Sequence, residues 1–434
     1  MKRKLIAAAF VGVFAWALTP AEAQGPLTPD SGPTETMKSL DQIEPRTPID
    51  SLPHTIDESG SYFIASDFSV SGNAILVTAD NVSLDLQGFT IEGDGTGTGI
   101  QIESADGVTV RNGTIRNFDR GLLAENSSYG RFLDLVVADN VNEGLHLRAL
   151  SGASNGHFVE RLRASDNGGR GVVLEADSGG IASGNQLIGI HSINSGEQGI
   201  QISAGGSGSE ANGNIIRDGR IQGTVSQAAL DLRSQFGTSR CNGNIIDNMQ
   251  IVDNQHKGIA LIGAGSDATL AGNIIKNSVI QGNGDDEPGI SFEAIFGSHI
   301  NGNLIENNVV RENASHGIHL FGTLNGVVRG SMIRGNRIEN NGGEGIWLVA
   351  EQALGTRIQD NVIAGHPGPM AGIRAEMGSS TFILSNIFYE NLAIMGGGFV
   401  IGPTLAETGE IDPEAGIQGW GNPWSNYLQD PDFL

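Results

Sequence analysis

One short pattern of apolar and polar positions recurs through most of the chain: a glycine, an aliphatic residue, any residue and a second aliphatic residue. Eleven copies occur, and neighbouring copies begin 22 to 31 residues apart. They begin at Gly99, Gly121, Gly144, Gly171, Gly199, Ala229, Gly258, Gly289, Gly317, Gly345 and Gly372. An apolar residue at every second position is typical of a β-strand with one buried face. Each unit therefore predicts short strands separated by turns.

A second series runs through the same units. Asn214, Asn244, Asn273 and Asn303 each precede two aliphatic residues and recur at intervals of 30, 29 and 30 residues. Asparagine tolerates a left-handed backbone, and its amide can bond to an asparagine stacked above it. We therefore expect these residues to be part of the architecture rather than glycosylation or ligand sites.

The repeat predicts a stack of coils. Units of about 25–30 residues with short strands, and no helical spacing of apolar residues, allow equivalent strands of successive coils to pair in parallel about 4.8 Å apart. The expected fold class is all-β: a single-stranded right-handed parallel β-helix, a solenoid of about 11–12 coils with N- and C-terminal caps. Residues 61–395 should form the β-helix, with the stack beginning at the strand of residues 82–86.

The two ends of the chain differ from the repeats. Residues 1–23 combine lysine and arginine, an apolar run and an A-x-A site, which is typical of a secretory signal peptide. The apolar run of about 14 residues is short for a membrane anchor, so we expect export to the periplasm or the cell exterior without membrane insertion. Residues 24–60 should form a flexible lead and N-terminal cap. Residues 396–434 should form a C-terminal cap, where four prolines oppose sheet formation.

The net charge limits the classes of partner that we expect, and the cysteine content excludes a disulfide. The 434 residues include 25 Lys and Arg and 49 Asp and Glu, a net charge of −24, and removal of residues 1–23 would make the net charge −26. Nucleic acid is therefore excluded as an expected partner, because its affinity comes from clustered basic residues. Cys241 is the only cysteine, so no intramolecular disulfide forms. It aligns with Ala211, Leu270 and Ile300, and we expect its thiol to be a small buried apolar group.

Two segments resemble a known superfamily. Residues 80–91 (DNVSLDLQGFTI) and 108–115 (VTVRNGTI) are similar to the opening coils of pectate-lyase-like β-helix proteins. Residues 44–49 and 422–426 resemble the entry and exit of exported bacterial β-helix proteins, so the resemblance spans about residues 44–434. The superfamily includes polysaccharide lyases, polygalacturonases, epimerases, phage tailspikes and periplasmic copper-maturation proteins. The resemblance thus implies the fold and favours a polysaccharide partner, but it leaves the activity open.

The polygalacturonase motif is matched only in part. Asp285 and Asp286 precede one strand, and His316 followed by Gly317 resembles the His-Gly element of that family one coil later. Where the family carries Arg-x-Lys to hold the substrate carboxylate, this chain has Trp347. A glycoside hydrolase is therefore the less favoured enzymatic reading.

The second and fourth residues after each motif glycine should point outward, and in the N-terminal half they include the candidate catalytic residues. This histidine–arginine group consists of His146, Arg148, Glu175, Asp231 and Arg233. A β-eliminating lyase needs a cation for the uronate carboxylate and a base for the α-proton. Arg148 or calcium could supply the first, and His146 or Arg148 the second. Glu103 and Glu125 are the predicted calcium ligands. The alternative is an acid–base ladder with a structural role.

A second outward set is the candidate substrate-binding site. This aromatic group consists of Glu293, His319, Phe321, Trp347 and Arg374. Trp347 would offer a platform for a sugar ring, with Glu293 or His319 as acid or base; the alternative is that a turn from an adjoining coil covers the ring. The histidines show no His-x-His spacing, which disfavours a copper or zinc role.

These observations favour one hypothesis and leave two alternatives. The first is an exported β-helix protein that binds or processes a polysaccharide along its outward sheet face, with polysaccharide lyase ahead of glycoside hydrolase as the chemistry. The alternative is a non-catalytic surface or periplasmic scaffold that recognises a glycan or a protein. The sequence does not predict the oligomeric state.

Overall fold

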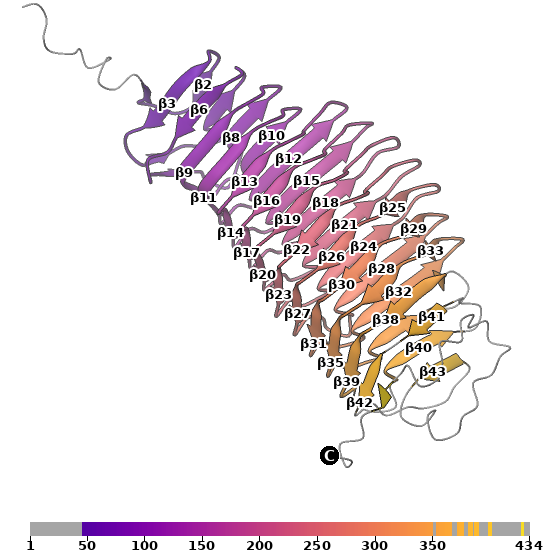
Figure 1. Ribbon diagram of the computed structural model, residues 1–434. Helices are drawn as coiled ribbons and strands as arrows, with labels where there is room; N and C mark the ends of the chain where they lie inside the picture. The colour runs from indigo at the N-terminus through magenta and orange to yellow at the C-terminus, as the bar shows by residue number, and fades with distance from the viewer. Residues whose placement is uncertain are drawn as a thin grey trace, which may run out of the picture. The chain divides into compact units, whose positions relative to one another are not determined.

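The computed structural model describes residues 46–349, 353–366, 371–376, 381–384, 386–389, 398–401 and 427–428. All regular structure in this part of the chain is β-strand. Strands of successive coils lie side by side (Figure 1), and the fold is the right-handed parallel β-helix that the repeat predicts. The predicted signal peptide lies outside the described residues. Within them, no helix is long and apolar enough to cross a membrane.

The Gly-aliphatic repeat forms one 14-stranded sheet, which we call the repeat sheet. The eleven motif copies are strands β8 (Thr98–Glu103), β10 (Arg120–Glu125), β12 (Leu145–Leu150), β15 (Val172–Asp177), β18 (Ile200–Ala204), β21 (Leu230–Ser234), β24 (Ile259–Gly263), β28 (Ile290–Ile295), β32 (Ile318–Thr323), β36 (Ile346–Leu348) and β40 (Ile373–Glu376). The register pairs each motif residue with its equivalent in the next coil, as Leu147 with Leu174 and Arg148 with Glu175. The sequence repeat therefore gives the register directly.

A 26-stranded sheet supplies the other two walls of most coils, in two rows. The first row contains β3 (Gly60–Ile64), β6 (Val82–Asp85), β9 (Thr109–Arg116), β11 (Arg131–Ala138), β13 (Phe158–Glu160), β16 (Gln186–Ile188), β19 (Ile215–Arg217), β22 (Ile245–Asp247), β26 (Ile274–Lys276), β30 (Leu304–Glu306), β34 (Met332–Arg334), β38 (Thr356–Gln359) and β41 (Thr381–Leu384). The second contains β4 (Phe68–Ser69), β7 (Thr90–Glu92), β14 (Arg163–Ser165), β17 (His191–Ile193), β20 (Arg220–Gln222), β23 (Gln250–Val252), β27 (Val279–Gln281), β31 (Val309–Arg311), β35 (Arg337–Glu339), β39 (Val362–Ala364) and β42 (Ile387–Tyr389). The long strands β9 and β11 pair with both rows. A four-stranded sheet of β25 (Thr269–Ala271), β29 (His299–Asn301), β33 (Val327–Arg329) and β37 (Ala353–Leu354) adds a short side.

The stack begins upstream of the predicted first strand. Strand β1 (Thr47–Ile49) pairs in parallel with β3, and β3 pairs with β6. In the repeat sheet, β2 (His54–Ile56) and β5 (Ile75–Val77) precede β8. The expectation that residues 82–86 begin the stack is therefore wrong. These early strands lack the motif glycine, since Ala74 stands in its place before β5, and the repeat pattern does not detect them.

Two short strands beyond residue 396 join the sheets. β43 (Gly398–Ile401) pairs antiparallel with β40, and β44 (Tyr427–Leu428) pairs in parallel with β42. The expectation that proline keeps this segment out of a sheet is wrong for these two stretches, neither of which contains a proline. The four prolines themselves, together with Trp420 and Trp424, lie outside the described residues.

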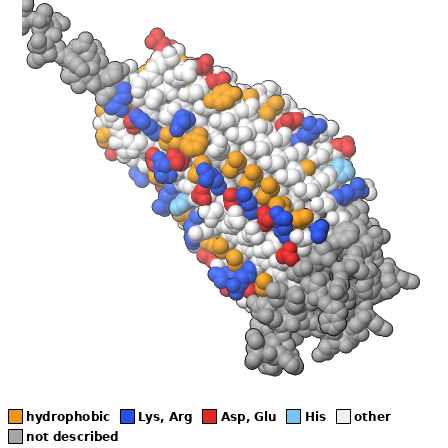
Figure 2. Space-filling model, viewed as in Figure 1, with side chains coloured by type: hydrophobic (Ala, Val, Ile, Leu, Met, Phe, Trp, Pro, Cys, Tyr) orange, Lys and Arg blue, Asp and Glu red, His pale blue; other side chains and the backbone are white. Residues whose placement is uncertain are grey.

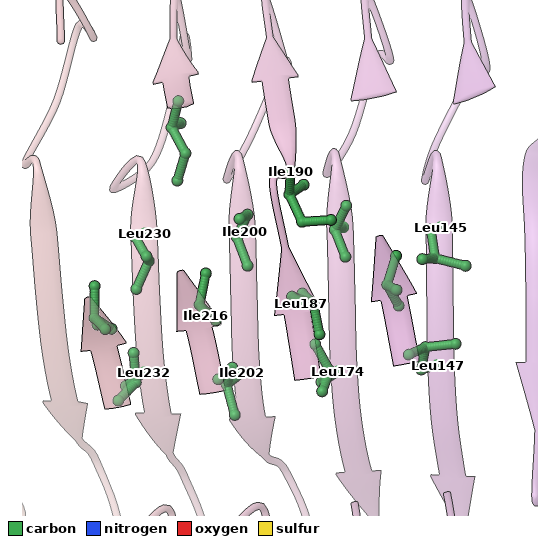
Figure 3. Packing of buried hydrophobic residues seen from close by; sticks show 14 of the residues in the cluster. Leu145, Leu147, Leu174, Leu187, Ile190, Ile200, Ile202, Ile216, Leu230 and Leu232 are labelled. Atoms are coloured by element: carbon green, nitrogen blue, oxygen red, sulfur yellow. The ribbon is translucent and has the colours of Figure 1, made fainter. Parts of the chain in front are cut away.

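The interior of the coils is a continuous column of aliphatic side chains. Leu174, Ile202 and Leu232 of the repeat sheet face Leu187 of β16 and Ile216 of β19 (Figure 3), and all five are fully buried. Burial of one such side chain stabilises the fold by about 1.5–3 kcal/mol. Because every coil contributes equivalent residues, each coil depends on its neighbours for its own burial.

The asparagine ladder is confirmed, but its two predicted roles fall on different residues. From Asn185 through Asn214, Asn244 and Asn273 to Asn303, each amide nitrogen donates to the amide oxygen of the next asparagine at 2.9–3.1 Å. These side chains are buried and have ordinary backbone angles. The left-handed conformation occurs instead at a second set of turn asparagines, Asn248, Asn277 and Asn307, with φ of 52–55°.

The expectation for Cys241 is also confirmed. Its side chain is fully buried beside Ala211, Leu270 and Ile300, which have no exposed area either. Burial raises the pKa of the thiol. The residue therefore acts as a small apolar member of the core.

Candidate functional site

The register places the residues of the histidine–arginine group, the aromatic group and the Glu103–Glu125 pair on the outward face of the repeat sheet, in two columns. The first column, two residues after the motif glycine, contains His146, Asp231, His319, Trp347 and Arg374. The second column, four residues after it, contains Glu103, Glu125, Arg148, Glu175, Arg233, Glu293 and Phe321. The predicted alternation of inward and outward positions therefore holds along the strands.

Pointing outward does not mean exposed in this fold. His146 is 4% exposed and Asp231 is 0% exposed, although both leave the sheet on the side away from the core. Strands of adjacent coils are only about 4.8 Å apart, so long side chains of one coil cover short ones of the next. Polar side chains that the sequence pattern predicts to be exposed to solvent are therefore buried in the structure.

A third column lies on the same face, immediately before the motif glycine, and of its members only His316 was singled out from the sequence. Its members include Arg120, Glu143, Arg170, Gln198, Lys257, His316 and Glu344. These are charged or polar side chains that contact the other two columns, as the bonds of Arg170 show below. Reading one position further back in the aligned copies would have found them.

The first half of the histidine–arginine group is a cluster around Glu175. The Nε2 atom of His146 lies 2.9 Å from Oε2 of Glu175, and the guanidinium of Arg148 lies 3.3 Å from the same carboxylate. Arg148 also reaches Glu125 at 3.3 Å and Asp177 at 3.9 Å. The hydrogen bond with His146 lowers the pKa of Glu175, and the charges of His146 and Arg148 add to this effect. One arginine is therefore shared among three carboxylates.

Arg170 links this cluster to the rest of the face. Its guanidinium bonds at 2.6 Å to Glu143 and at 2.6 Å to the amide oxygen of Gln201. Glu143 also accepts from Arg120 at 2.8 Å. Burial acts to raise the pKa of Glu143, but the hydrogen bond from Arg170 and the nearby positive charges lower it overall. The amide nitrogen of Gln201 in turn donates to Asp231 at 3.3 Å.

Asp231 is the second half of the group. Its carboxylate lies 2.7 Å from Arg233 and accepts weak hydrogen bonds of 3.3 Å from Gln198 and Gln201. Burial raises its pKa despite these partners. Three strand-to-strand steps separate Asp231 on β21 from His146 on β12, a distance of about 14 Å. The five predicted catalytic residues therefore form two linked clusters and not one compact centre.

The aromatic group is a stack built across three coils. The rings of His319 and Trp347 are parallel, with centroids 4.6 Å apart and an interplanar angle of 8°. On the following coil, the guanidinium carbon of Arg374 lies 5.1 Å from the centre of the Trp347 ring. Trp347 thus lies between neighbours from the coil before and the coil after, and it does not present a free face to a sugar. Its neighbours are side chains of strands β32 and β40 and not the turn that the alternative interpretation expects.

Charges around the aromatic group are neutralised within it. His316 lies 2.7 Å from Glu344, which also accepts from Arg374 at 3.1 Å. Burial acts to raise the pKa of Glu344, but these two partners lower it to about 2. Burial and the nearby charges of His316 and Lys257 lower the pKa of His319 to about 3, so its imidazole is neutral.

Glu293, the remaining acidic member of the aromatic group, is also held in place. Its carboxylate lies 2.6 Å from the ammonium of Lys257 and accepts a 2.6 Å hydrogen bond from Ser291. Phe321 stacks on His319 with a centroid distance of 5.0 Å. The group is therefore a packed unit of interlocking side chains.

Several polar atoms on this face lack partners even though they are buried. Among the described residues, His146 Nδ1, Gln198 Oε1, Asp231 Oδ1 and Arg233 Nε make no hydrogen bond. In the aromatic group the same holds for His319 Nε2 and Trp347 Nε1. Buried polar atoms are nearly always satisfied in folded proteins, and because these atoms have no accessible surface, ordered water within the packed face would be needed to satisfy them.

Exposed aromatic rings border the repeat sheet in the turns that follow its strands. Phe236 follows β21, which carries Asp231 and Arg233, and is 61% exposed. Phe296 follows β28 and is 57% exposed. The face therefore has accessible aromatic surface, but it comes from these turns and not from Trp347.

Charge on the surface is mixed. Acidic and basic side chains lie next to one another on the visible part of the described chain (Figure 2). Within the described residues, no three His, Cys, Asp or Glu side chains are placed to hold a metal ion. Glu125 is paired with Arg148, and the structure gives no support to the predicted calcium site at Glu103 and Glu125.

Comparison with known families agrees with this fold. A family model of the right-handed β-helix region matches residues 55–216, which defines the class of the protein. A second model, described as periplasmic copper-binding protein (NosD), matches residues 188–428. This match covers more than half of the chain, and the chain belongs to the NosD family.

Several solved structures are similar to this chain in fold. They include the mannuronan C-5 epimerase A-module of Azotobacter vinelandii (14% identity, 80% of this chain and 88% of that chain, TM-score 0.42). An alginate lyase from a Paenibacillus species has 12% identity over 66% of this chain and 95% of that one, with a TM-score of 0.40. The receptor-binding tailspike of bacteriophage Det7 has 13% identity over 80% and 75%, with a TM-score of 0.47. Similarity at this level does not extend to activity. No curated protein matches the chain.

The family description implies copper, which prefers cysteine, methionine and histidine donors that converge on one point. Among the described residues these donors do not converge. Cys241 is sealed in the core, and the sulfur of Met249 accepts a hydrogen bond from a backbone N–H. His316 and His319 have ring centroids 5.3 Å apart, but no third donor is placed to complete a site. The described part of the chain therefore does not fit a copper centre.

Proposed function

We propose that this protein is an exported carbohydrate-binding β-helix that holds a neutral polysaccharide along the outward face of the repeat sheet, between β12 and β36. The observation that carries the proposal is the pair of exposed aromatic side chains beside this face: Phe236 and Phe296, 61% and 57% exposed, in the turns that follow strands β21 and β28. Sugar hydroxyls both donate and accept hydrogen bonds, so a chain of sugars can accept from the remaining N–H groups of Arg148 and Arg233, whose side chains are 31% and 21% exposed.

The repetition of the face supports a linear ligand. Equivalent side chains recur at each strand, about 4.8 Å apart, so successive sugars meet successive coils. Phe236 and Phe296 stand at the border of the face and are exposed, which gives sugar rings the aromatic contact that the covered Trp347 does not.

The pairing of charges favours a neutral glycan over an acidic one. Arg148 is surrounded by three carboxylates, Arg170 bonds to Glu143, and Arg233 bonds to Asp231. A uronate would find these cations already engaged, on a chain whose net charge is −24. Bringing it there would place a further negative charge among carboxylates.

A polysaccharide lyase remains the enzymatic alternative, and one observation favours it. The 2.9 Å contact between His146 and Glu175 would orient the imidazole as a base. Against it stands Arg148, which elimination would require to neutralise the substrate carboxylate but which Glu125 and Glu175 already neutralise. We therefore place binding ahead of elimination.

Incubation of the mature protein with neutral and uronate-containing polysaccharides tests both readings at once. Affinity electrophoresis would report binding, while unsaturated-uronate absorbance and new reducing ends would report lyase and hydrolase activity. We expect retardation by at least one neutral polysaccharide and neither chemical signal. Both signals rising together would establish a lyase. Absence of binding across the panel would contradict the proposal.

A further inference from the structure

A groove of about 260 Å³ lies on a different wall of the coils from the repeat sheet, over strands β20, β23 and β27. Six residues line it: Arg220, Gln250, Val252, Asp253, Val279 and Gln281. None of them belongs to the groups described above, and the proposed function does not use them.

Amide and apolar side chains alternate on the floor of the groove. On adjacent strands β23 and β27, Gln250 pairs with Val279 and Val252 pairs with Gln281. Both valines are half-buried. The two apolar side chains therefore lie diagonally across the floor, with an amide beside each.

The polar walls retain hydrogen-bonding capacity. Arg220 donates to Gln250 Oε1 at 2.9 Å, which fixes that amide so that its Nε2 hydrogens point elsewhere. Asp253 accepts one hydrogen bond, 3.3 Å from Gln222, through Oδ2. Within the described residues, Gln250 Nε2 and Asp253 Oδ1 make no hydrogen bond. A donor and an acceptor thus stand on either side of an apolar floor.

Gln281 differs from Gln250, because both ends of its amide are already used. Its oxygen accepts from Arg311 at 3.0 Å and its nitrogen donates to Glu312 at 2.7 Å. It therefore serves as a fixed wall, and recognition falls to Gln250, Asp253 and the remaining N–H groups of Arg220.

Size and charge define the ligand class. Two strand-to-strand steps from β20 to β27 span about 10 Å, which suits one sugar ring with its substituents. The opposite charges of Arg220 and Asp253 balance, so the groove does not favour a charged ligand over a neutral one. We infer that this groove binds a single neutral sugar ring, with its C–H face on Val252 and Val279 and its hydroxyls on Gln250, Asp253 and Arg220.

The sugar could be a free monosaccharide or one unit of a longer chain, and saturation-transfer NMR separates the two. The test titrates the mature protein with glucose, galactose and mannose, and with neutral oligosaccharides of each. We expect at least one neutral sugar to bind. A monosaccharide signal identifies the free ring as sufficient, and a signal from oligosaccharides alone assigns the groove to a chain.

Three variants make the assignment specific. Gln250→Ala should weaken binding about tenfold, and Val252→Trp should fill the groove and abolish it. Gln186→Ala is the matched control, since Gln186 is also an exposed first residue of a three-residue strand but lies outside the groove. Its affinity and the melting temperatures of all three variants should equal those of the parent protein.

Two outcomes would overturn the inference: no neutral sugar binds, or Gln250→Ala and Val252→Trp leave binding unchanged. The outcome is independent of the proposed function. If binding persists in the groove variants but is lost on Phe236→Ala, the repeat-sheet face alone is the site; the reverse pattern supports the groove alone.

Discussion

The carboxylate of Asp231 lies 2.7 Å from the guanidinium of Arg233, two residues along the same strand, and is fully buried although it leaves the sheet on the side away from the core. A buried carboxylate is costly unless it is paired and hydrogen-bonded. Here the pairing comes from Arg233, Gln198 and Gln201, but one carboxylate oxygen remains without a partner. Protonation of Asp231 relieves this cost, and burial accordingly raises the pKa of its carboxyl group.

Asp231 should give the protein a measurable dependence of stability on pH. Because burial raises its folded-state pKa above the ordinary 3.8, the folded state binds this proton more tightly than the unfolded state. The resulting stabilisation is complete below pH 3.8 and is lost as pH rises through the folded pKa. Asp231→Asn removes it. We expect the melting temperature of the parent protein, minus that of the variant, to decrease as pH rises from 3.8, and a difference that increases would contradict this assignment.

Glu344 should have the opposite effect at acid pH. Its pKa falls from 4.5 to about 2 in the folded state, so the stability that it contributes is present above pH 4.5 and is lost as pH falls toward 2. Glu344→Gln should therefore lose less stability than the parent protein between pH 4.5 and 2, as measured by urea unfolding at each pH. Glu312→Gln, a change at an exposed glutamate, serves as the control and should follow the parent curve. Parallel curves for Glu344→Gln and the parent would refute the prediction.

The asparagine ladder should be more sensitive to substitution than the turn asparagines. Asn244→Ala removes the acceptor of the Asn214 backbone N–H (2.9 Å) and the donor to the Ala211 carbonyl (3.0 Å), all in the buried interior. Leaving these groups unsatisfied should cost on the order of 3 kcal/mol in the free energy of unfolding.

The matched control for the ladder is Asn277→Gly. Asn277 is exposed and has a φ of 54°, a conformation that glycine adopts readily, so we expect a change below about 0.5 kcal/mol. Denaturant unfolding of the two variants provides the comparison. Equal destabilisation would mean that the ladder bonds do not contribute as the structure indicates.

Cys241 should be chemically inert in the folded protein. Its thiol is fully buried and its pKa is raised by burial, and both effects suppress the reactive thiolate. Ellman's reagent should therefore label no thiol under native conditions and one thiol per chain in denaturant. Rapid labelling of the native protein would show that the core around Cys241 opens.

The fold was predictable from the repeat because equivalent positions in successive copies of the motif pair with one another, which gives the strand register directly. Gly-aliphatic-x-aliphatic marks which residues face the core, and strands such as β12 and β15 pair residue by residue as the aligned copies do. The first coils escaped detection since β5 begins after Ala74 rather than glycine. Strand β43 escaped detection because its antiparallel pairing with β40 follows no repeat.

For the candidate site, the sequence predicted which residues lie in the outward columns, but not their burial or their contacts. Alternation along a strand gives the direction of His146 and Asp231, but it does not show that neighbouring coils bury them, because burial depends on the lengths of side chains one coil away. The bridging role of Arg170 was missed since it precedes the motif glycine. The groove at Gln250 involves partners from three coils, and no local pattern in the sequence contains that combination.

The most direct test of the central claim is the affinity of a neutral polysaccharide, identified from the panel, for the mature parent protein and three variants, measured by isothermal titration calorimetry. Phe236→Ala and Phe296→Ala remove the exposed rings at the border of the repeat-sheet face, whereas Gln186→Ala alters an exposed glutamine on another wall. If the glycan lies along the repeat sheet, the first two substitutions should each weaken binding about tenfold and the third should leave it unchanged. Equal affinity of all three variants, with melting temperatures intact, would contradict the claim.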